Sequence, residues 1–462
     1  MKLIKKITAL LTLLSVVFTM PYLAATEEYE SEDIPMYIGE YEETEEEKEY
    51  IVYFNDSVVS LYADEGKDYA LMNEEELSSC LEEDIVEFYE ENSYVYLYGE
   101  ESPYDPMHAT YKWDMKLINA DYALEKGYTG DGVKVAVIDS GCNITGDLYE
   151  NILEGYNLVD KNKDVTDTVN HGTMVSGQIA AEMNYVGFRG VAPEAKIVPL
   201  KIFDDDQKKA KVSLVADAIK MAVDDYDCDI INMSLGTGSD SETLKAAVNY
   251  AASKNVLMIA AMGNNGTTEY SYPAAYDGVV AVGAVDHGKY ICDYSQRNDA
   301  IDVCAPGGSD DAYIACLSTN PENNKYFQSK GTSFSAPIVT GIAALFREID
   351  ADFTHDEFME VIEFASIDLG KSGYDTNYGY GMADVKKYLM YYFAPMGDSD
   401  ADGVVSVDDA LEIVKYIVEG VSDMAKPKAA DVDKDGSISL KDAILVARFA
   451  SGWDGYEMPD YD

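Results

Sequence analysis

Histidine is scarce in this sequence, with four residues among 462. Because histidine is the side chain that most often acts as a general base near neutral pH, few positions can fill that role. Cysteine is sparse too, with six residues and no Cys-x-x-Cys pair, which argues against a zinc site. Cys80 alone precedes residue 108, so an odd number follows it. We therefore expect buried free thiols rather than a full set of disulfides.

Positively charged side chains are few. Lysine and arginine total 34, against 86 aspartate and glutamate residues, which gives a formal net charge of −52. This balance excludes a general nucleic-acid binder and argues against adsorption to anionic membranes. It favours solubility and the binding of calcium.

Long apolar runs are absent with one exception. A basic start at 1–6 leads into the apolar stretch 7–20, and residues 21–25 resemble a cleavage region. This pattern is typical of a secretory signal peptide, which we place at 1–25. No later stretch reaches eighteen apolar residues, so we expect a secreted, extracellular protein without membrane insertion.

The stretch 331–337 has the sequence Gly-Thr-Ser-Phe-Ser-Ala-Pro and leads into an apolar run. It predicts a loop that opens into a buried helix, with Ser333 near the N-terminus. We expect Pro337 in the first turn, where its missing N–H costs little. Ser333 is then either an ordinary helix cap or a nucleophile whose Oγ lies at the positive end of the helix dipole. Both interpretations remain open on this stretch alone.

Two other segments supply partners for a nucleophilic serine. His171 precedes a run of small and apolar residues that predicts a helix, and a histidine at a helix N-terminus stays neutral and able to accept a proton. Asp139 follows the apolar, β-branched run 133–138, which predicts a buried strand. An aspartate at the C-terminal end of a parallel strand lies where α/β folds place their sites, and a carboxylate there can orient the imidazole.

The order Asp139, His171, Ser333, with the residues around each, resembles the three signature blocks of the subtilisin-like serine proteases (subtilases, peptidase family S8). The resemblance covers 108–392 and implies a serine endopeptidase with these three catalytic residues and with protein or peptide substrates. It also implies that Asn264 binds the oxyanion. The substrate-binding residues it implies are Ser234, Leu235 and Gly236. Met262 and Phe334 depart from the residues common in the family, so no preferred substrate residue is predicted.

Strands and helices alternate through this region, which predicts an α/β domain with a parallel sheet covered on both faces, in three layers. We expect strands at 133–138, 196–202, 230–234, 256–261 and 279–285, and helices at 213–223, 242–253 and 356–364.

Residues 26–107 have a different composition, with 28 acidic residues against Lys48 and Lys67. Strand-like stretches at 50–54 and 94–98 and a helix-like region within 74–91 predict a small α+β unit. Its place before the catalytic domain resembles a subtilase propeptide that binds the enzyme in cis, assists its folding and blocks the active site. The alternative is a solvated acidic spacer.

The end of the chain, 393–462, contains a twelve-residue pattern that recurs 33 positions later. Each copy has aspartates at loop positions 1, 3, 5 and 12 and glycine at 6, the spacing by which one loop wraps a calcium ion, and each leads into a helix. The duplicated loop and exit helix resemble a small all-α dockerin, which implies two bound Ca²⁺ ions and a cohesin partner on a scaffoldin. The alternative is a calcium-stabilised tail without a partner. The expected ligands are Asp398, Asp400, Asp402, Val404, Ser406 and Asp409, then Asp431, Asp433, Asp435, Ser437, Ser439 and Asp442.

These observations predict a secreted protease that is attached, through its dockerin, to a cellulosome-type complex at the cell surface. The sequence leaves open whether the catalytic domain has further calcium sites. The competing hypothesis is a catalytically inactive binding or adhesion protein on a protease fold, carried by a scaffoldin. The sequence has the expected residue at all four catalytic positions, the three of the triad and Asn264, which argues against this hypothesis.

Overall fold

The computed structural model describes residues 49–54, 69–82, 85–91, 112–184, 187–203, 210–317, 326–419 and 426–453. The chain forms two compact units, Met1–Ser102 and Pro103–Asp462, and each is described by itself. The expected signal peptide and the strand expected at 94–98 lie outside the described residues. No helix within them is long and apolar enough to span a membrane.

The described part of the first unit is a three-stranded antiparallel sheet with one helix. The elements are β1 (Glu49–Phe54), β2 (Tyr69–Asn73), α3 (Glu74–Glu82) and β3 (Val86–Glu91), and the sheet order is β2-β1-β3. Val52, Leu77 and Cys80 form a small buried core. The helix expected within 74–91 ends at Glu82, because residues 86–91 form strand β3, which pairs with β1.

The second unit is built on a seven-stranded, all-parallel sheet with the order β10-β9-β8-β7-β4-β6-β5. Its strands are rich in β-branched residues and almost continuously buried, as expected for a sheet covered on both faces. The strands are β4 (Lys134–Asp139), β5 (Tyr156–Asn157), β6 (Lys196–Lys201), β7 (Ile230–Met233), β8 (Leu257–Ala261), β9 (Val279–Val285) and β10 (Val303–Pro306).

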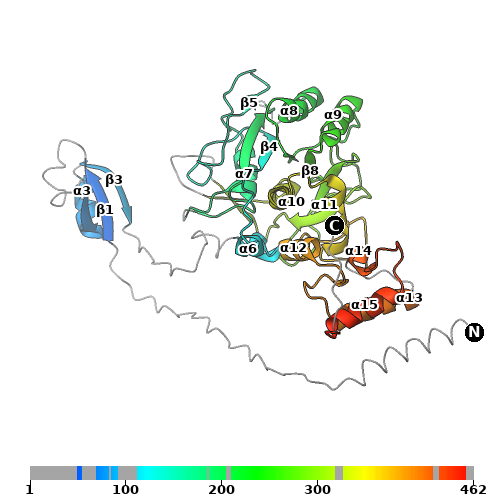
Figure 1. Ribbon diagram of the computed structural model, residues 1–462. Helices are drawn as coiled ribbons and strands as arrows, with labels where there is room; N and C mark the ends of the chain where they lie inside the picture. The colour runs from blue at the N-terminus through cyan, green and yellow to red at the C-terminus, as the bar shows by residue number, and fades with distance from the viewer. Residues whose placement is uncertain are drawn as a thin grey trace, which may run out of the picture. The chain divides into compact units, whose positions relative to one another are not determined.

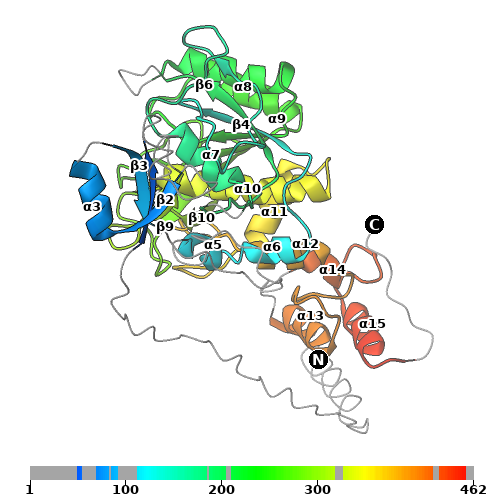
Figure 2. The ribbon, with the colours of Figure 1, turned by 90° about the vertical axis from the view of Figure 1, so that its left-hand side faces the viewer.

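Successive residues of each strand face opposite layers, which makes the unit three layers thick (Figure 2). On β4, Val135 and Val137 join the core with α7 (Gly172–Ala180) and α10 (Thr332–Ile349). Ala136 and Ile138 join the opposite core with α8 (Val212–Asp224) and α9 (Glu242–Ser253). The predicted α/β fold with a central parallel sheet is therefore confirmed. The other described elements of this domain are α5 (Trp113–Leu117), α6 (Asp121–Glu125), β11 (Ile314–Cys316), β12 (Phe327–Ser329), α11 (His355–Ala365) and α12 (Val385–Phe393).

The C-terminal part of the second unit is helical, with α13 (Val407–Glu419), α14 (Pro427–Ala430) and α15 (Leu440–Ala450). Helices α13 and α15 pack against each other (Figure 1). Lys426, between the two repeats, is buried, and its Nζ donates to the carbonyl oxygens of Tyr391, Tyr392 and Ala394 at 2.8, 3.3 and 2.9 Å. One lysine thus joins the repeats to the end of α12, the last helix before them.

All six cysteines lie within described residues, and each is a buried thiol that takes no part in a disulfide. Burial is the main cause that raises the pKa of the Cys142 thiol to about 12, so this group is a poor nucleophile despite its closeness in sequence to Asp139.

Candidate active site and calcium loops

Asp139 and His171 are in direct contact. Asp139 is the last residue of β4 and is buried, and its Oδ1 and Oδ2 lie 2.8 and 2.9 Å from His171 Nδ1. His171 is the N-cap residue of α7. The Ser140 N–H donates to the same Oδ1 atom at 2.7 Å, which helps to fix the carboxylate. A carboxylate on Nδ1 holds the imidazole so that its Nε2 is the basic atom.

A second buried aspartate, which the sequence analysis missed, shapes the loop before His171. Asp167 Oδ1 accepts bonds from the Ser140 hydroxyl and from the Val169 and Asn170 N–H groups. Its Oδ2 accepts from the N–H and hydroxyl of Thr173, at 2.9 and 2.7 Å. The carboxylate therefore joins the end of β4, the loop and the first turn of α7. In the sequence, Asp167 stands four positions before His171, as Asp-x-x-x-His. That spacing alone does not distinguish it from any other polar loop residue that bonds to its neighbours.

Ser333 is the second residue of α10, and Pro337 is the sixth. The prediction that Pro337 lies in the first turn is therefore wrong, because Ser333 itself belongs to the helix. A proline there cannot donate to the carbonyl oxygen four residues earlier, which is that of Ser333. The Ser234 hydroxyl donates to that oxygen instead, at 2.9 Å, and Ser333 Oγ donates to the Ser234 carbonyl oxygen at 3.2 Å.

Asn264 follows β8 and contacts the same turn of α10. Its Oδ1 accepts from both the N–H and the hydroxyl of Thr332 at 2.9 Å. Because a backbone N–H can only donate, this contact places the amide oxygen toward Thr332 and the Nδ2 donor away from it. Gly331, with φ +148°, allows the approach, since a Cβ at that position would lie 3.2 Å from Asn264 Nδ2.

Two adjacent cavities contain the expected site residues. A cleft of about 590 Å³ is lined by Asp139, His171 and several apolar side chains, and a smaller one of about 260 Å³ by Asn264 and Ser333. Ser234, Leu235 and Gly236 line both cavities.

The two residues that depart from the family pattern lie outside the smaller cavity's lining. Phe334 is buried, and its ring centroid is 5.9 Å from that of His171, so it links the histidine to the turn that carries Ser333. Met262 is buried in the core shared with α8 and α9. Neither is among the residues that line the smaller cavity.

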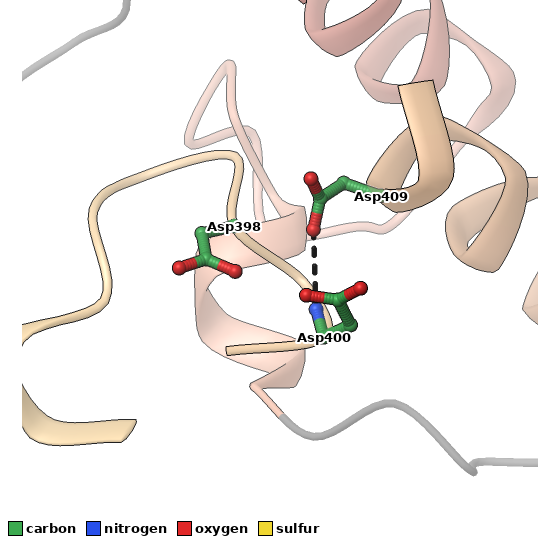
Figure 3. Close-up of side chains that lie close together, drawn as sticks. All are labelled: Asp398, Asp400 and Asp409. Carbon is green, nitrogen blue, oxygen red and sulfur yellow. Dashed lines mark hydrogen bonds between the residues drawn. The ribbon is translucent and has the colours of Figure 1, made fainter. Parts of the chain in front are cut away.

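The first C-terminal loop gathers carboxylates at one point (Figure 3). Oxygen atoms of Asp398, Asp400 and Asp409 all lie within 4.8 Å of one another. Burial, followed by the Asp409 charge, raises the pKa of Asp400 to about 6. Hard oxygen ligands with crowded negative charge fit a calcium ion. Asp402 instead accepts from the Val404 N–H, and the Ser406 N–H donates to Asp409.

The second loop repeats this arrangement in part. Oxygen atoms of Asp431, Asp433 and Asp435 lie within 4.8 Å of one another, whereas Asp442 lies outside that cluster and accepts from the N–H groups of Asp433 and Ser439. Lys441 forms an ion pair with Asp433. Ser437 donates to Asp435 through its N–H and hydroxyl. The carboxylate oxygens of this loop are ligands that fit calcium. Lys441 would compete with the ion for the Asp433 carboxylate.

Comparison with known proteins identifies the family. The model of the subtilase family, Peptidase S8, matches residues 130–381, more than half of the chain. This chain is a subtilase. As such it is a serine-type endopeptidase by class. The dockerin type I domain model matches residues 396–449, so the subtilase carries a C-terminal dockerin. Subtilases and type I dockerins are, in general, calcium-binding.

Individual relatives cover different shares of the subtilase. M-protease of Shouchella clausii (strain KSM-K16) is 32% identical over 380 residues, 81% of this chain and 95% of that protein. Minor extracellular protease Epr of Bacillus subtilis (strain 168) is 36% identical over 276 residues, but the chain spans only 41% of that protein. A solved structure of proteases from Pseudoalteromonas arctica has 29% identity and a TM-score of 0.56, and covers 62% of this chain and 98% of its own.

Proposed function

We propose that this subtilase is a secreted serine endopeptidase that hydrolyses peptide bonds through Asp139, His171 and Ser333. The Nδ1 contact between His171 and Asp139, at 2.8 Å, carries the proposal. That contact orients the imidazole so that Nε2 is the atom that takes the proton of Ser333 Oγ as this oxygen attacks the peptide carbonyl. His171 then gives the proton to the leaving amine, Asp139 stabilises the imidazolium, and water hydrolyses the acyl-enzyme.

The oxyanion of the tetrahedral intermediate is bound by Asn264 Nδ2 and the Ser333 N–H. The contact of Asn264 Oδ1 with the Thr332 N–H supports this role, since it turns the amide donor away from α10. Removing such a donor costs about 3–4 kcal/mol of transition-state stabilisation. The extended substrate follows Ser234, Leu235 and Gly236, which line both cavities.

The dockerin attaches the enzyme to a cohesin module of a scaffoldin in a cellulosome-type complex, outside the cell. Asp398, Asp400 and Asp409 would hold one calcium ion, and Asp431, Asp433 and Asp435 a second. When bound, calcium neutralises the carboxylates and fixes each loop against its exit helix. The acidic N-terminal unit acts as a propeptide in cis; its small three-stranded sheet with one helix is consistent with the α+β unit expected there.

The test separates catalysis from attachment. The matured enzyme and the Ser333→Ala variant are compared for peptide hydrolysis, for labelling by a fluorophosphonate probe and for calcium-dependent capture by immobilised cohesins. We expect Ser333→Ala to lose hydrolysis and labelling but to keep calcium binding and capture. Wild-type turnover in Ser333→Ala would overturn the catalytic assignment. A wild-type protein that is folded and captured but never labelled would favour the inactive binding protein.

A further inference from the structure

The smaller cavity, beside Ser333 and Asn264, has a lining rich in hydrogen-bond acceptors. Glu269, Ser271 and Gln296 contribute to it. Among the described residues that line this cavity, Glu269 is the only one with an acidic or basic side chain. Ser333 lines the cavity as well, so the cavity can take a substrate side chain next to the scissile bond.

Gln296 is held in one orientation. Its Nε2 donates to the Glu269 carbonyl oxygen at 2.6 Å, and because that oxygen can only accept, the amide nitrogen must face it. The Oε1 atom consequently faces Gly263, where a Cβ would lie 1.9 Å from it. Gly263 has φ +104°, so a side chain is disfavoured there on two grounds. The result is a fixed acceptor next to the residue that precedes Asn264.

The segment that carries Glu269 is fixed as well. Its carbonyl oxygen accepts from both Gln296 and Asn298, at 2.6 and 2.9 Å. The Glu269 side chain is exposed, and within the described part of the chain no lysine, arginine or histidine forms an ion pair with it. The backbone is therefore anchored while the carboxylate is available to a bound molecule.

We propose that this cavity selects a lysine or arginine side chain and that Glu269 is the specificity-determining residue. Ammonium and guanidinium groups are donors without acceptors, which matches a lining that includes Glu269 and Gln296, two residues whose side chains carry acceptor oxygens. An apolar side chain would desolvate both acceptors without giving them a partner, and an acidic one would meet the Glu269 charge. Residues 108–462 alone carry a formal net charge of −29, which attracts cationic peptides in addition. This inference rests on the proposed peptidase function.

The experiment uses the matured enzyme and peptides that differ only at the residue before the cleaved bond, with arginine, lysine, glutamine, phenylalanine or glutamate there. We expect kcat/KM for lysine and arginine to exceed that for glutamine by about tenfold. Glu269→Gln should lower the lysine-to-glutamine ratio by about five- to tenfold, as for loss of a partly screened ion pair. Glu363→Gln, on α11, makes the same change of net charge at a residue outside the cavity lining and should leave the ratio unchanged.

Charge reversal gives a second readout that does not depend on a loss of activity. Glu269→Lys should raise kcat/KM for the glutamate peptide above that for lysine. A wild-type preference for phenylalanine, or a Glu269→Gln effect equal for every peptide, would overturn the inference while the peptidase assignment stands. Absence of any hydrolysis that Ser333→Ala abolishes would overturn the proposed function, and the inference with it.

Discussion

The carbonyl oxygen of Ser333, in the first turn of α10, accepts a hydrogen bond at 2.9 Å from the Oγ of Ser234, the residue that follows β7. The bond exists because Pro337 cannot donate to that oxygen within α10. Ser234 Oγ is itself held by Asn232 Nδ2 at 3.0 Å, and Asn232 Oδ1 accepts from the Thr340 hydroxyl at 2.8 Å. This buried chain of bonds positions the turn of the nucleophile against the end of β7.

Ser234→Ala should lower kcat by roughly tenfold, since an unpaired buried carbonyl costs about 1–3 kcal/mol and releases the turn of Ser333. The double variant Ser234→Ala with Pro337→Ala restores a helical N–H four residues after Ser333 and should regain part of kcat. Steady-state kinetics on one peptide measures both. Ser239→Ala, at an exposed position three residues beyond the site segment, is the control and should be neutral. A double variant no better than Ser234→Ala would contradict this account.

Much of the catalytic layout was predictable because it depends on local patterns. The apolar run before Asp139 and the small-residue segment after His171 predict a strand end and a helix start, and β4 and α7 lie there. The expected strand at 279–285 and the helix at 242–253 match β9 and α9 residue for residue. In these long segments, the periodic pattern of apolar residues in the sequence matches the pattern of buried side chains in the structure.

The parts that escaped prediction depend on contacts between distant segments. The role of Pro337 follows from a hydroxyl 103 positions earlier, at Ser234, and no local rule includes that partner. The two-residue strand β5 is stabilised by pairing with β6 rather than by its own sequence. Lys426 has no special sequence context, yet it is buried against α12. Tertiary contacts therefore decided each of these features.

Asp167→Asn should lower kcat by about ten- to hundredfold with a smaller change in KM, because the amide offers one acceptor oxygen where the carboxylate offers two, and its NH₂ faces donors of the loop. The loop that precedes His171 would lose the bonds to Val169, Asn170 or Thr173. The experiment measures kcat and KM separately for the variant and the wild type, and records kcat as a function of pH. A purely structural role would instead lower the melting temperature and leave kcat per folded molecule unchanged.

Asp160→Asn serves as the matched control for that experiment. Asp160 lies in the same region of the chain, is exposed, and accepts from the Asn157 side chain at 3.1 Å without contact to His171. We expect its kinetics to remain within about twofold of the wild type, as for most surface substitutions. An equal loss in both variants would show that general charge, rather than the loop, is responsible.

Asp302 makes stability depend on pH. Burial raises its pKa from an ordinary 3.8 to about 7, while the Ala281 N–H donates to Oδ2 at 2.7 Å. The folded protein therefore keeps this proton up to about pH 7, whereas the unfolded chain releases it near pH 3.8. Stability falls by up to about 1.4 kcal/mol per pH unit across that window and is constant above it.

Asp302→Asn retains an acceptor for the Ala281 N–H and removes the titration. Relative to the parent, its melting temperature should therefore rise between pH 5 and pH 8, measured in a Ser333→Ala background that prevents self-digestion. Asp277→Asn, in an exposed loop nearby, should show no such trend. A variant that is less stable than its parent at pH 8 would mean that the charged carboxylate is stabilised in the folded protein, contrary to this prediction.

The junction between the catalytic domain and the dockerin gives the last prediction. Lys426 Nζ donates to three carbonyl oxygens at the C-terminal end of α12, where the helix dipole also favours a cation. Ala401, from the first calcium loop, packs against the core of the catalytic domain. Lys426→Met would leave these carbonyl groups without their charged donor and should destabilise the junction by about 2–4 kcal/mol.

We therefore expect Lys426→Met to be cleaved by an added protease between 392 and 398 much faster than the wild type, in the Ser333→Ala background. Lys415→Met, at a lysine of α13 that pairs with Glu412 at 3.7 Å on the surface, is the control and should be cleaved at the wild-type rate. If the junction is rigid, chelating calcium should accelerate cleavage of the wild type as well, because the loop that carries Ala401 loses its ligand. Equal cleavage of all three proteins, with and without calcium, would show that the dockerin is tethered by a flexible segment and that the lysine does not hold it.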